Sequence, residues 1–194
     1  MGEIPGGPDE KNSSPIPPPS FLNVEQRAER VRLLLLDCDG VLTDGRVTLL
    51  GDGDDEKSFH TRDGHGIVLL HRAGLRSGVI SGRTSNALTR RAKDLGMHFV
   101  RQGTWDKLKD FDELLLEAGV GAEEVCYVGD DVTDIPLMAR SGLAVAVADA
   151  SEDTLAFAHH VTRLAGGHGA VREVCELILK AQGHWAELMK RYLE

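Results

Sequence analysis

The feature that most constrains this chain is an apolar run that ends in two carboxylates. Residues 31–36 are aliphatic except for Arg32, and Asp37 and Asp39 follow directly. An apolar run of this length is typical of a central strand that is buried on both faces of a sheet. In open α/β sheets, ligands bind just beyond the carboxyl ends of the strands. The pattern therefore predicts a functional site where this strand ends.

The spacing of the two carboxylates indicates chemistry that uses both. On an extended backbone, the side chains of Asp37 and Asp39 leave on the same side. A divalent cation lets both stay ionised, and Mg²⁺ typically takes one or two carboxylates together with phosphate oxygens. Asp37 is then a candidate nucleophile toward a phosphoryl group, and Asp39 a candidate proton donor to the leaving alcohol. The alternative is a solvated Asp-Gly turn at Gly40, and this stretch alone leaves both open.

Length, charge and cysteine content indicate one acidic globular domain. The 194 residues are enough to bury a real core. The formal net charge of −9 argues against a nucleic-acid surface and against an anionic membrane face. No apolar run is as long as a transmembrane helix, and the N-terminus lacks the layout of a signal peptide. The three cysteines are far apart and indicate no disulfide framework, which favours a reduced, cytoplasmic protein.

The chain divides into three segments. Residues 1–20 hold six of the seven prolines and predict a disordered Pro/Gly/Ser-rich tail. Residues 21–183 are expected to form the globular domain, and residues 184–194 a C-terminal helical tail. Within the domain, apolar strand candidates alternate with helix candidates. This predicts an α/β fold with βαβ crossovers and a doubly wound, mostly parallel, Rossmann-like sheet that is covered on both faces.

A hairpin interrupts the alternation after the first strand. Residues 47–50 and 57–60 are short strand candidates, and residues 51–54 (Gly-Asp-Gly-Asp) between them give a strong turn signal. The pattern predicts a β-hairpin flap over the strand end, followed by a helix from Asp63 that stops at Gly74. The other predicted strands are residues 78–80, 99–101, 125–128, 143–147 and 161–162. The other predicted helices are residues 24–30, 85–95, 106–118, 135–140, 152–158 and 170–182.

Groups that suit phosphate follow two later strands. Ser81, Gly82 and Arg83 come after residues 78–80, and they offer a hydroxyl, backbone N–H groups and a guanidinium fork. Lys107 opens a predicted helix, whose positive N-terminal end also favours a phosphate. Taken singly, a plain Ser-Gly turn and a solvated surface lysine are the favoured interpretations of these two groups.

An acidic cluster follows the strand at residues 125–128. Asp130, Asp131 and Asp134 stand within five residues, in a chain that is already acidic. The preference of helix N-termini for Asp accounts for Asp134. It accounts less well for the adjacent pair, which a bound cation would explain.

The order of these groups resembles the haloacid dehalogenase superfamily of Mg²⁺-dependent phosphohydrolases, over about residues 31–148. The resemblance implies that Asp37 attacks phosphorus and forms an aspartyl-phosphate. It implies that Asp39 acts as general acid and then as base, while Ser81 and Lys107 hold the phosphoryl oxygens.

The same resemblance implies the metal ligands. Mg²⁺ would be held by Asp37, by the backbone carbonyl of Asp39 and by Asp130. Asp131 and Asp134 would support this site by orienting metal-bound waters or Lys107.

The chain resembles a capless branch of the superfamily, because neither gap between its motifs is long enough for a cap domain. Over about residues 30–183 it is similar to the 3-deoxy-D-manno-octulosonate (KDO) 8-phosphate phosphatases. The matching runs are DGVLTDG at residues 39–45, RDGHGI at 62–67, Ser81 to Arg83, QGTWDK at 102–107, GDDVTDIPLM at 129–138, AVAVADA at 144–150 and GGHGAVREVCELILKAQ at 166–182.

This second resemblance implies a cytoplasmic homotetramer of lipopolysaccharide biosynthesis that hydrolyses a sugar phosphate. Hairpins would pack at its centre, and the C-terminal tail of one subunit would reach the site of the next. Nucleic acid and membrane partners are not expected. The implied substrate contacts are Asp39, His60, Thr61, Arg62, Asp63, Gly64, Arg83, Arg91 and Lys107.

Two departures leave the exact sugar open. Val68 and His168 stand where the octulosonate phosphatases commonly have arginine. A nine-carbon keto-deoxy sugar phosphate is therefore an alternative substrate. A non-catalytic sugar-phosphate-binding scaffold is a further alternative, although all the expected catalytic residues are present. A phospho-acceptor receiver domain is disfavoured, because its acceptor Asp comes two strands after its acidic pair.

Overall fold

The computed structural model describes residues 22–49 and 55–193. Its centre is a six-stranded sheet in the order β5-β4-β1-β6-β7-β8, in which every neighbouring pair is parallel. The strands are β1 (Leu33–Leu36), β4 (Arg76–Ser81), β5 (Phe99–Gln102), β6 (Val125–Gly129), β7 (Leu143–Ala146) and β8 (His160–Val161). The predicted doubly wound parallel sheet is confirmed.

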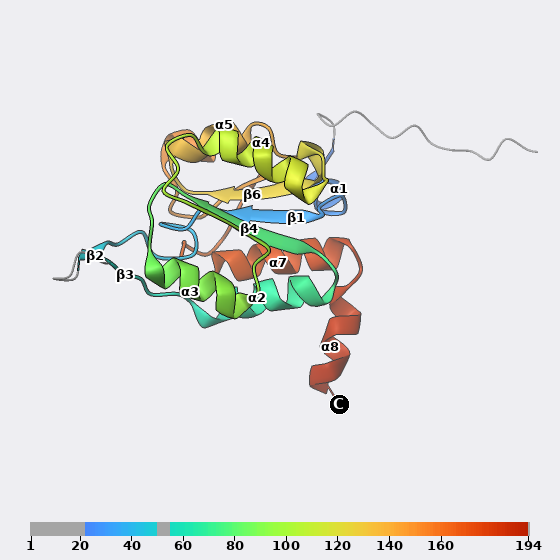
Figure 1. Cartoon of the computed structure of the whole chain (residues 1–194). Helices are drawn as coiled ribbons and strands as arrows, with labels where there is room; N and C mark the ends of the chain where they lie inside the picture. Colours follow the sequence, from blue (N-terminus) through green and yellow to red (C-terminus); the bar gives the residue numbers. More distant parts are fainter. Residues whose placement is uncertain (1–21, 50–54, 194) are drawn as a thin grey trace, which may run out of the picture.

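Helices cover both faces of the sheet (Figure 1). One layer contains α2 (Thr61–Arg72), α3 (Asn86–Leu95) and α7 (Ala170–Ala181), and the other contains α4 (Lys107–Ala118) and α5 (Ile135–Met138). The shorter elements are α1 (Val24–Ala28), α6 (Glu152–Leu155) and two 3-10 turns, Ala122–Glu124 and Val132–Asp134. The helix after the hairpin begins at Thr61, two residues before the predicted start, because His60 is extended at its N-cap.

Strand β1 has no polar residue because both of its faces are buried. Leu34 and Leu36 lie in the core shared with α2 and α7, whereas Leu33 and Leu35 lie in the core shared with α4 and α5. All four are fully buried. Because side chains alternate across a strand, Asp37 continues on the side of Leu33 and Leu35, where α4 begins.

The hairpin differs in part from the prediction. It consists of β2 (Thr48–Leu49) and β3 (Asp55–Glu56), which pair antiparallel and project from the main body (Figure 1). The second strand was expected at residues 57–60, and this was wrong. Lys57 instead points inward to Asp39, and His60 occupies the N-cap position of α2. The predicted turn at residues 51–54 lies outside the described residues.

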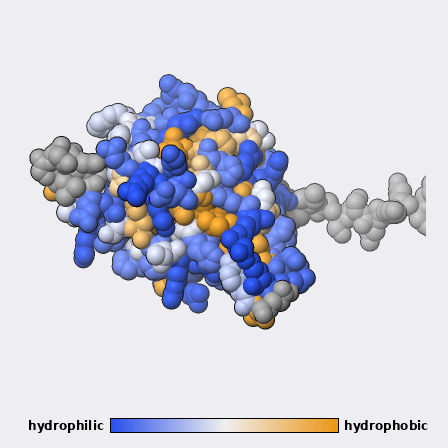
Figure 2. Space-filling model, turned by 60° about the horizontal axis from the view of Figure 1, so that its bottom comes forward, coloured by the Kyte–Doolittle hydropathy of each residue, from blue (hydrophilic) through white to orange (hydrophobic). Residues whose placement is uncertain are grey.

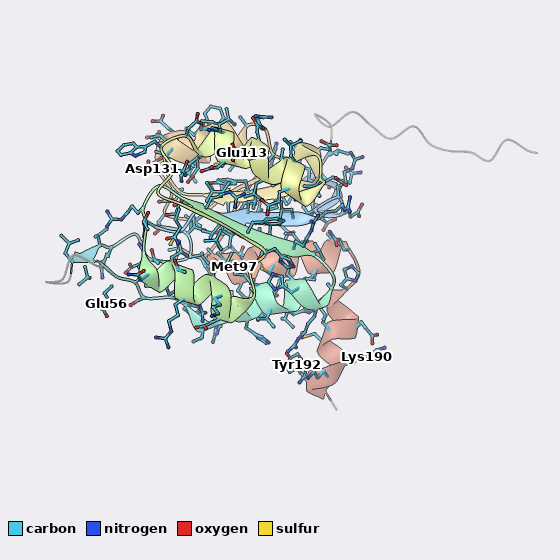
Figure 3. The ribbon with its side chains drawn as sticks, viewed as in Figure 1. Glu56, Met97, Glu113, Asp131, Lys190 and Tyr192 are labelled. Carbon is cyan, nitrogen blue, oxygen red and sulfur yellow. The ribbon has the colours of Figure 1, made fainter. Side chains whose placement is uncertain are left out.

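The C-terminal tail is helical, as expected. Helix α8 (Trp185–Leu193) leaves the main body next to α7 (Figure 1). Tyr192 points back toward α2, where its hydroxyl lies 3.0 Å from His65 Nε2 and 3.1 Å from Arg72 (Figure 3). The face that carries α8 is mainly hydrophilic with small hydrophobic patches (Figure 2). The predicted N-terminal tail lies outside the described residues, and no helix within them is long and apolar enough to cross a membrane.

Candidate active site

The candidate site lies at the topological switch point of the sheet, where the strand order changes direction. From β1 the chain adds β4 and β5 on one side, and then β6, β7 and β8 on the other. The crevice between the ends of β1 and β6 is the usual ligand position in such sheets. A pocket of about 680 Å³ opens there, and one of its lining residues, Asp131, is labelled at this end of the sheet in Figure 3. The predicted site residues that line it are Asp37, Asp39, Ser81, Arg83, Lys107, Asp130 and Asp131.

Lys107 joins the first and the last acidic motifs. Its Nζ lies 2.7 Å from Asp37 Oδ1 and 2.7 Å from Asp134 Oδ1. The lysine is the first residue of α4, so the N-terminal end of that helix adds positive potential. Burial alone would lower the pKa of Lys107, but the two carboxylates together raise it. The lysine therefore remains a cation beside Asp37.

Asp134 organises the cluster. Its Oδ1 also accepts a hydrogen bond from the buried Tyr127 hydroxyl at 2.8 Å, and its Oδ2 accepts one from the Asp130 amide at 3.0 Å. The side chain is fully buried. Because both oxygens already accept hydrogen bonds, Asp134 is better suited to hold Lys107 and the loop after β6 than to bind a metal. Tyr127 was not among the predicted site residues, and its signal in the sequence was a single hydroxyl in an otherwise apolar strand.

Three carboxylates meet closely enough to bind a cation. One oxygen each from Asp37, Asp130 and Asp134 lies within 4.8 Å of the others. The predicted metal set contains Asp39 in place of Asp134, because it counted the Asp39 backbone carbonyl. Within residues 22–49 and 55–193, the Asp130 carboxylate accepts no hydrogen bond from the protein. It is therefore available to a ligand.

The carboxylates of this cluster lie buried or half-buried beside one another, which disfavours their ionised forms. Burial and the neighbouring Asp134 raise the pKa of Asp37 to about 7. Burial and the neighbouring Asp37 raise the pKa of Asp130 to about 8. Two acids that are reluctant to ionise at neutral pH fit a site that is completed by a divalent cation.

Asp39 faces a different set of partners. Its carboxylate forms an ion pair with Lys57, which is only 2% exposed, and Oδ2 lies 3.7 Å from Arg83 Nε. Lys57 follows β3 directly, so this pair connects the hairpin to the loop that follows β1. Lys57 was expected in a strand, with no role in the site. It lies 18 residues after Asp39 in the sequence, so no local pattern signalled the pair.

Close backbone packing shapes the rest of the pocket. Ser81 is 1% exposed, and its Oγ accepts a hydrogen bond from the Arg83 amide at 3.3 Å. Gly40 has a φ of +90°, and a Cβ there would overlap the Asp130 carboxylate. Only glycine lets the loop after β1 turn while Asp130 reaches across it.

The remaining predicted substrate contacts do not line this pocket. The stretch from His60 to Gly64 forms the start of α2, and Arg91 Nη2 lies 3.5 Å from the His60 carbonyl oxygen. Arg91 also lies against Gly64, where a Cβ would clash with its guanidinium. Thr61 and Arg62 are exposed. The structure groups these residues with each other and not with Asp37.

Asp63 has a structural task in the described chain. It is 1% exposed, and its carboxylate accepts hydrogen bonds from the amides of Gly169 at 3.2 Å and Arg172 at 2.7 Å. It therefore caps the N-terminal end of α7 and ties that helix to α2. Its predicted contact with substrate stays a prediction.

Comparison with known proteins identifies the kind of enzyme. Residues 82–174 match the family model of haloacid dehalogenase-like hydrolases. The 3-deoxy-D-manno-octulosonate 8-phosphate phosphatase of Yersinia pestis is 48% identical over 160 residues, which are 82% of this chain and 86% of the relative.

Solved structures give the same result. The Moraxella catarrhalis 3-deoxy-D-manno-octulosonate 8-phosphate phosphatase, in complex with magnesium ion, phosphate ion and KDO, is 36% identical. Its TM-score is 0.85, over 87% of this chain and 97% of that one. The cobalt-bound Haemophilus influenzae phosphatase is 42% identical with a TM-score of 0.79, over 81% of this chain and 92% of that one. This chain therefore belongs to the 3-deoxy-D-manno-octulosonate 8-phosphate phosphatase family of haloacid dehalogenase-like hydrolases, and it is a phosphoric monoester hydrolase.

Proposed function

We propose that the protein hydrolyses KDO 8-phosphate to KDO and phosphate through an aspartyl-phosphate on Asp37. The observation that carries the proposal is the buried Asp37 beside Lys107, in one pocket with Asp39, Ser81 and Asp130. Two of the relatives described above are named as phosphatases of this ester, which supports the choice of substrate.

In the first step, Asp37 attacks phosphorus and the bond to the sugar oxygen breaks. Asp39 gives its proton to that oxygen, so the sugar leaves as an alcohol. Lys107 and Ser81 hold the phosphoryl oxygens and stabilise the charge that spreads over them. Asp134 and Tyr127 keep Lys107 in place through the hydrogen bonds described above.

In the second step, Asp39 takes a proton from water, and the water oxygen attacks phosphorus. The bond to Asp37 breaks, which releases phosphate and regenerates the carboxylate. Lys57 and Arg83 hold the Asp39 side chain at the pocket through both steps.

We propose Mg²⁺ as the cofactor, held by Asp37, the Asp39 carbonyl and Asp130. The ion would neutralise the phosphate so that an anionic nucleophile can approach it. The raised pKa values of Asp37 and Asp130 support a cation at this position. Hard carboxylate and carbonyl oxygens are the ligands that Mg²⁺ prefers.

The assembly and setting form part of the proposal. The hairpin exposes Val47 and Leu49, which are 46% and 76% exposed, and a homotetramer would bury them. In such an assembly, a neighbouring subunit would bring the start of α2 or the C-terminal tail to the open pocket. We propose that the reaction belongs to lipopolysaccharide biosynthesis and takes place in the cytoplasm, which the family resemblance supports.

Phosphate release across a small ester panel with Mg²⁺ tests the substrate. The panel contains KDO 8-phosphate, a nine-carbon keto-deoxy sugar 9-phosphate, a hexose phosphate and a nucleoside monophosphate. We expect kcat/KM for KDO 8-phosphate to exceed the others by roughly a hundredfold. A preference for the nine-carbon ester would move the assignment, with Val68 as the residue to change. No turnover of any ester would leave only a sugar-phosphate-binding role.

A further inference from the structure

Trp105 is a large side chain at the pocket to which the mechanism gives no role. It lines the same pocket as Asp39 and Lys107, and it is fully exposed, with a relative accessibility of 103%. Trp185, by contrast, lies under the cations of Arg172 and Lys180, at 5.4 and 5.0 Å from its ring. A free indole therefore stands at the mouth of a phosphate site.

The backbone on both sides of Trp105 is fixed. The Thr104 amide donates to the Ser81 carbonyl oxygen at 3.3 Å, which ties the turn to the end of β4. Asp106 caps α4 by accepting from the Lys109 amide at 3.1 Å. The backbone position of Trp105 is thus set relative to Ser81 and Lys107, which are the proposed phosphate contacts.

The pocket lining divides by chemistry. Its charged groups come from the ends of β1, β4 and β6 and from Asp106 and Lys107 at the start of α4, whereas Trp105, Leu108, Pro136 and Leu137 supply apolar surface on and beside α4 and on α5. Phosphate needs only the charged groups. An apolar flank suits a part of the substrate that carries C–H bonds, and the electron-rich face of an indole attracts the slightly positive hydrogens of a sugar.

We propose that Trp105 is a specificity residue that packs against the sugar part of the phosphate ester. This rests on the proposed function, since it assumes a sugar acid as leaving group. A small phosphate compound without a sugar, such as acetyl phosphate, gains no such contact. Trp105 therefore makes the enzyme select for the sugar and does not act on the phosphoryl group.

Kinetic selectivity tests the proposal. For wild type, Trp105→Phe and Trp105→Ala, kcat/KM is measured for KDO 8-phosphate and for acetyl phosphate. We expect the ratio of the two to fall about tenfold in the Ala variant, mainly through KM, and to be largely kept in the Phe variant. The control is Leu116→Ala, which removes another exposed apolar side chain, 84% exposed and outside this pocket, and which should leave both values unchanged.

Fluorescence supplies a second measurement. In a Trp185→Phe background, Trp105 is the only tryptophan in the chain. We expect KDO to change its emission and inorganic phosphate to leave the emission unaltered.

The outcomes are distinguishable. If the wild type does not hydrolyse KDO 8-phosphate, the proposed function fails. If it does, but Trp105→Ala lowers both kcat/KM values equally or neither, the role of Trp105 is refuted. Emission that is already that of a buried indole and does not respond to KDO would show that another copy of the chain covers Trp105, and would also refute the proposal.

Discussion

Replacing Asp37 with Asn should abolish turnover and, in the absence of metal, make the protein more stable. The carboxylate is buried beside Asp134, and this raises its pKa from 3.8 to about 7. The folded protein therefore holds this proton to a higher pH than the unfolded chain does. Ionised Asp37 costs stability above pH 7, and the cost disappears as the pH falls toward 4.

The size of the effect follows from the same shift. A rise in pKa from 3.8 to about 7 corresponds to about 4 kcal/mol of destabilisation at pH 8. The amide of the Asp37→Asn variant would hydrogen-bond its neighbours less well than the carboxylate does, which lowers the free energy of unfolding by about 1–2 kcal/mol. We expect a net gain of about 2–3 kcal/mol for Asp37→Asn at pH 8.

Urea denaturation at pH 8 in excess chelator measures this gain. The control is Asp112→Asn, which removes an exposed carboxylate paired with Arg140 and should change the free energy of unfolding by less than about 1 kcal/mol. Mg²⁺ should then stabilise the wild type more than the Asn variant, because it binds the folded state. An Asn variant that is no more stable than wild type under chelation would refute our account of the acidic cluster.

Three further predictions follow from individual contacts. Gly40→Ala should lower the affinity for Mg²⁺ and cost about 1–3 kcal/mol of stability, because the added Cβ displaces Asp130. Titration calorimetry measures the affinity, and an unchanged value would contradict this prediction. Lys57→Met should lower kcat about tenfold or more because it releases Asp39, and Lys57→Arg should recover part of the loss. Equal kcat values for wild type and both variants would exclude the role of Lys57. Burial and His98 lower the pKa of His71 to about 4, so its neutral form stabilises the fold above pH 6.5 and this stability is lost as the pH falls toward 4. The free energies of unfolding of wild type and His71→Asn should therefore approach each other by about 1 kcal/mol as the pH falls, after allowance for the half-exposed ring. Denaturation curves at several pH values measure this difference.

The strand ends were predictable because the chemistry there is local. An apolar run that stops at a carboxylate fixes both a buried strand and the place where its polar groups begin. Asp37, Ser81 and Asp130 could therefore be assigned to one edge of the sheet before their distances were known. The parallel topology then brings them to one pocket, as the strand order shows.

The contacts that cross between elements were not predictable. The pair of Lys57 with Asp39 depends on how the hairpin folds back, and short polar strands carry little register information. Asp63 was expected at substrate, but its neighbours are the amides at the start of α7, more than a hundred residues away in sequence. Such partners are set by the packing of α2 against α7, which no local pattern encodes.

The most direct test of the account is to locate the phosphoryl group on the enzyme. Acetyl phosphate needs no proton donor for its leaving group, so Asp39→Asn should be phosphorylated by it and then react slowly with water. The reaction with Mg²⁺ is quenched in acid, and the protein is digested and analysed by mass spectrometry. We predict a phosphoryl group on Asp37 in the Asp39→Asn variant and none when Asp37→Asn is added. A phosphoryl group on another residue, or hydrolysis of KDO 8-phosphate by a folded Asp37→Asn variant, would contradict the central claim.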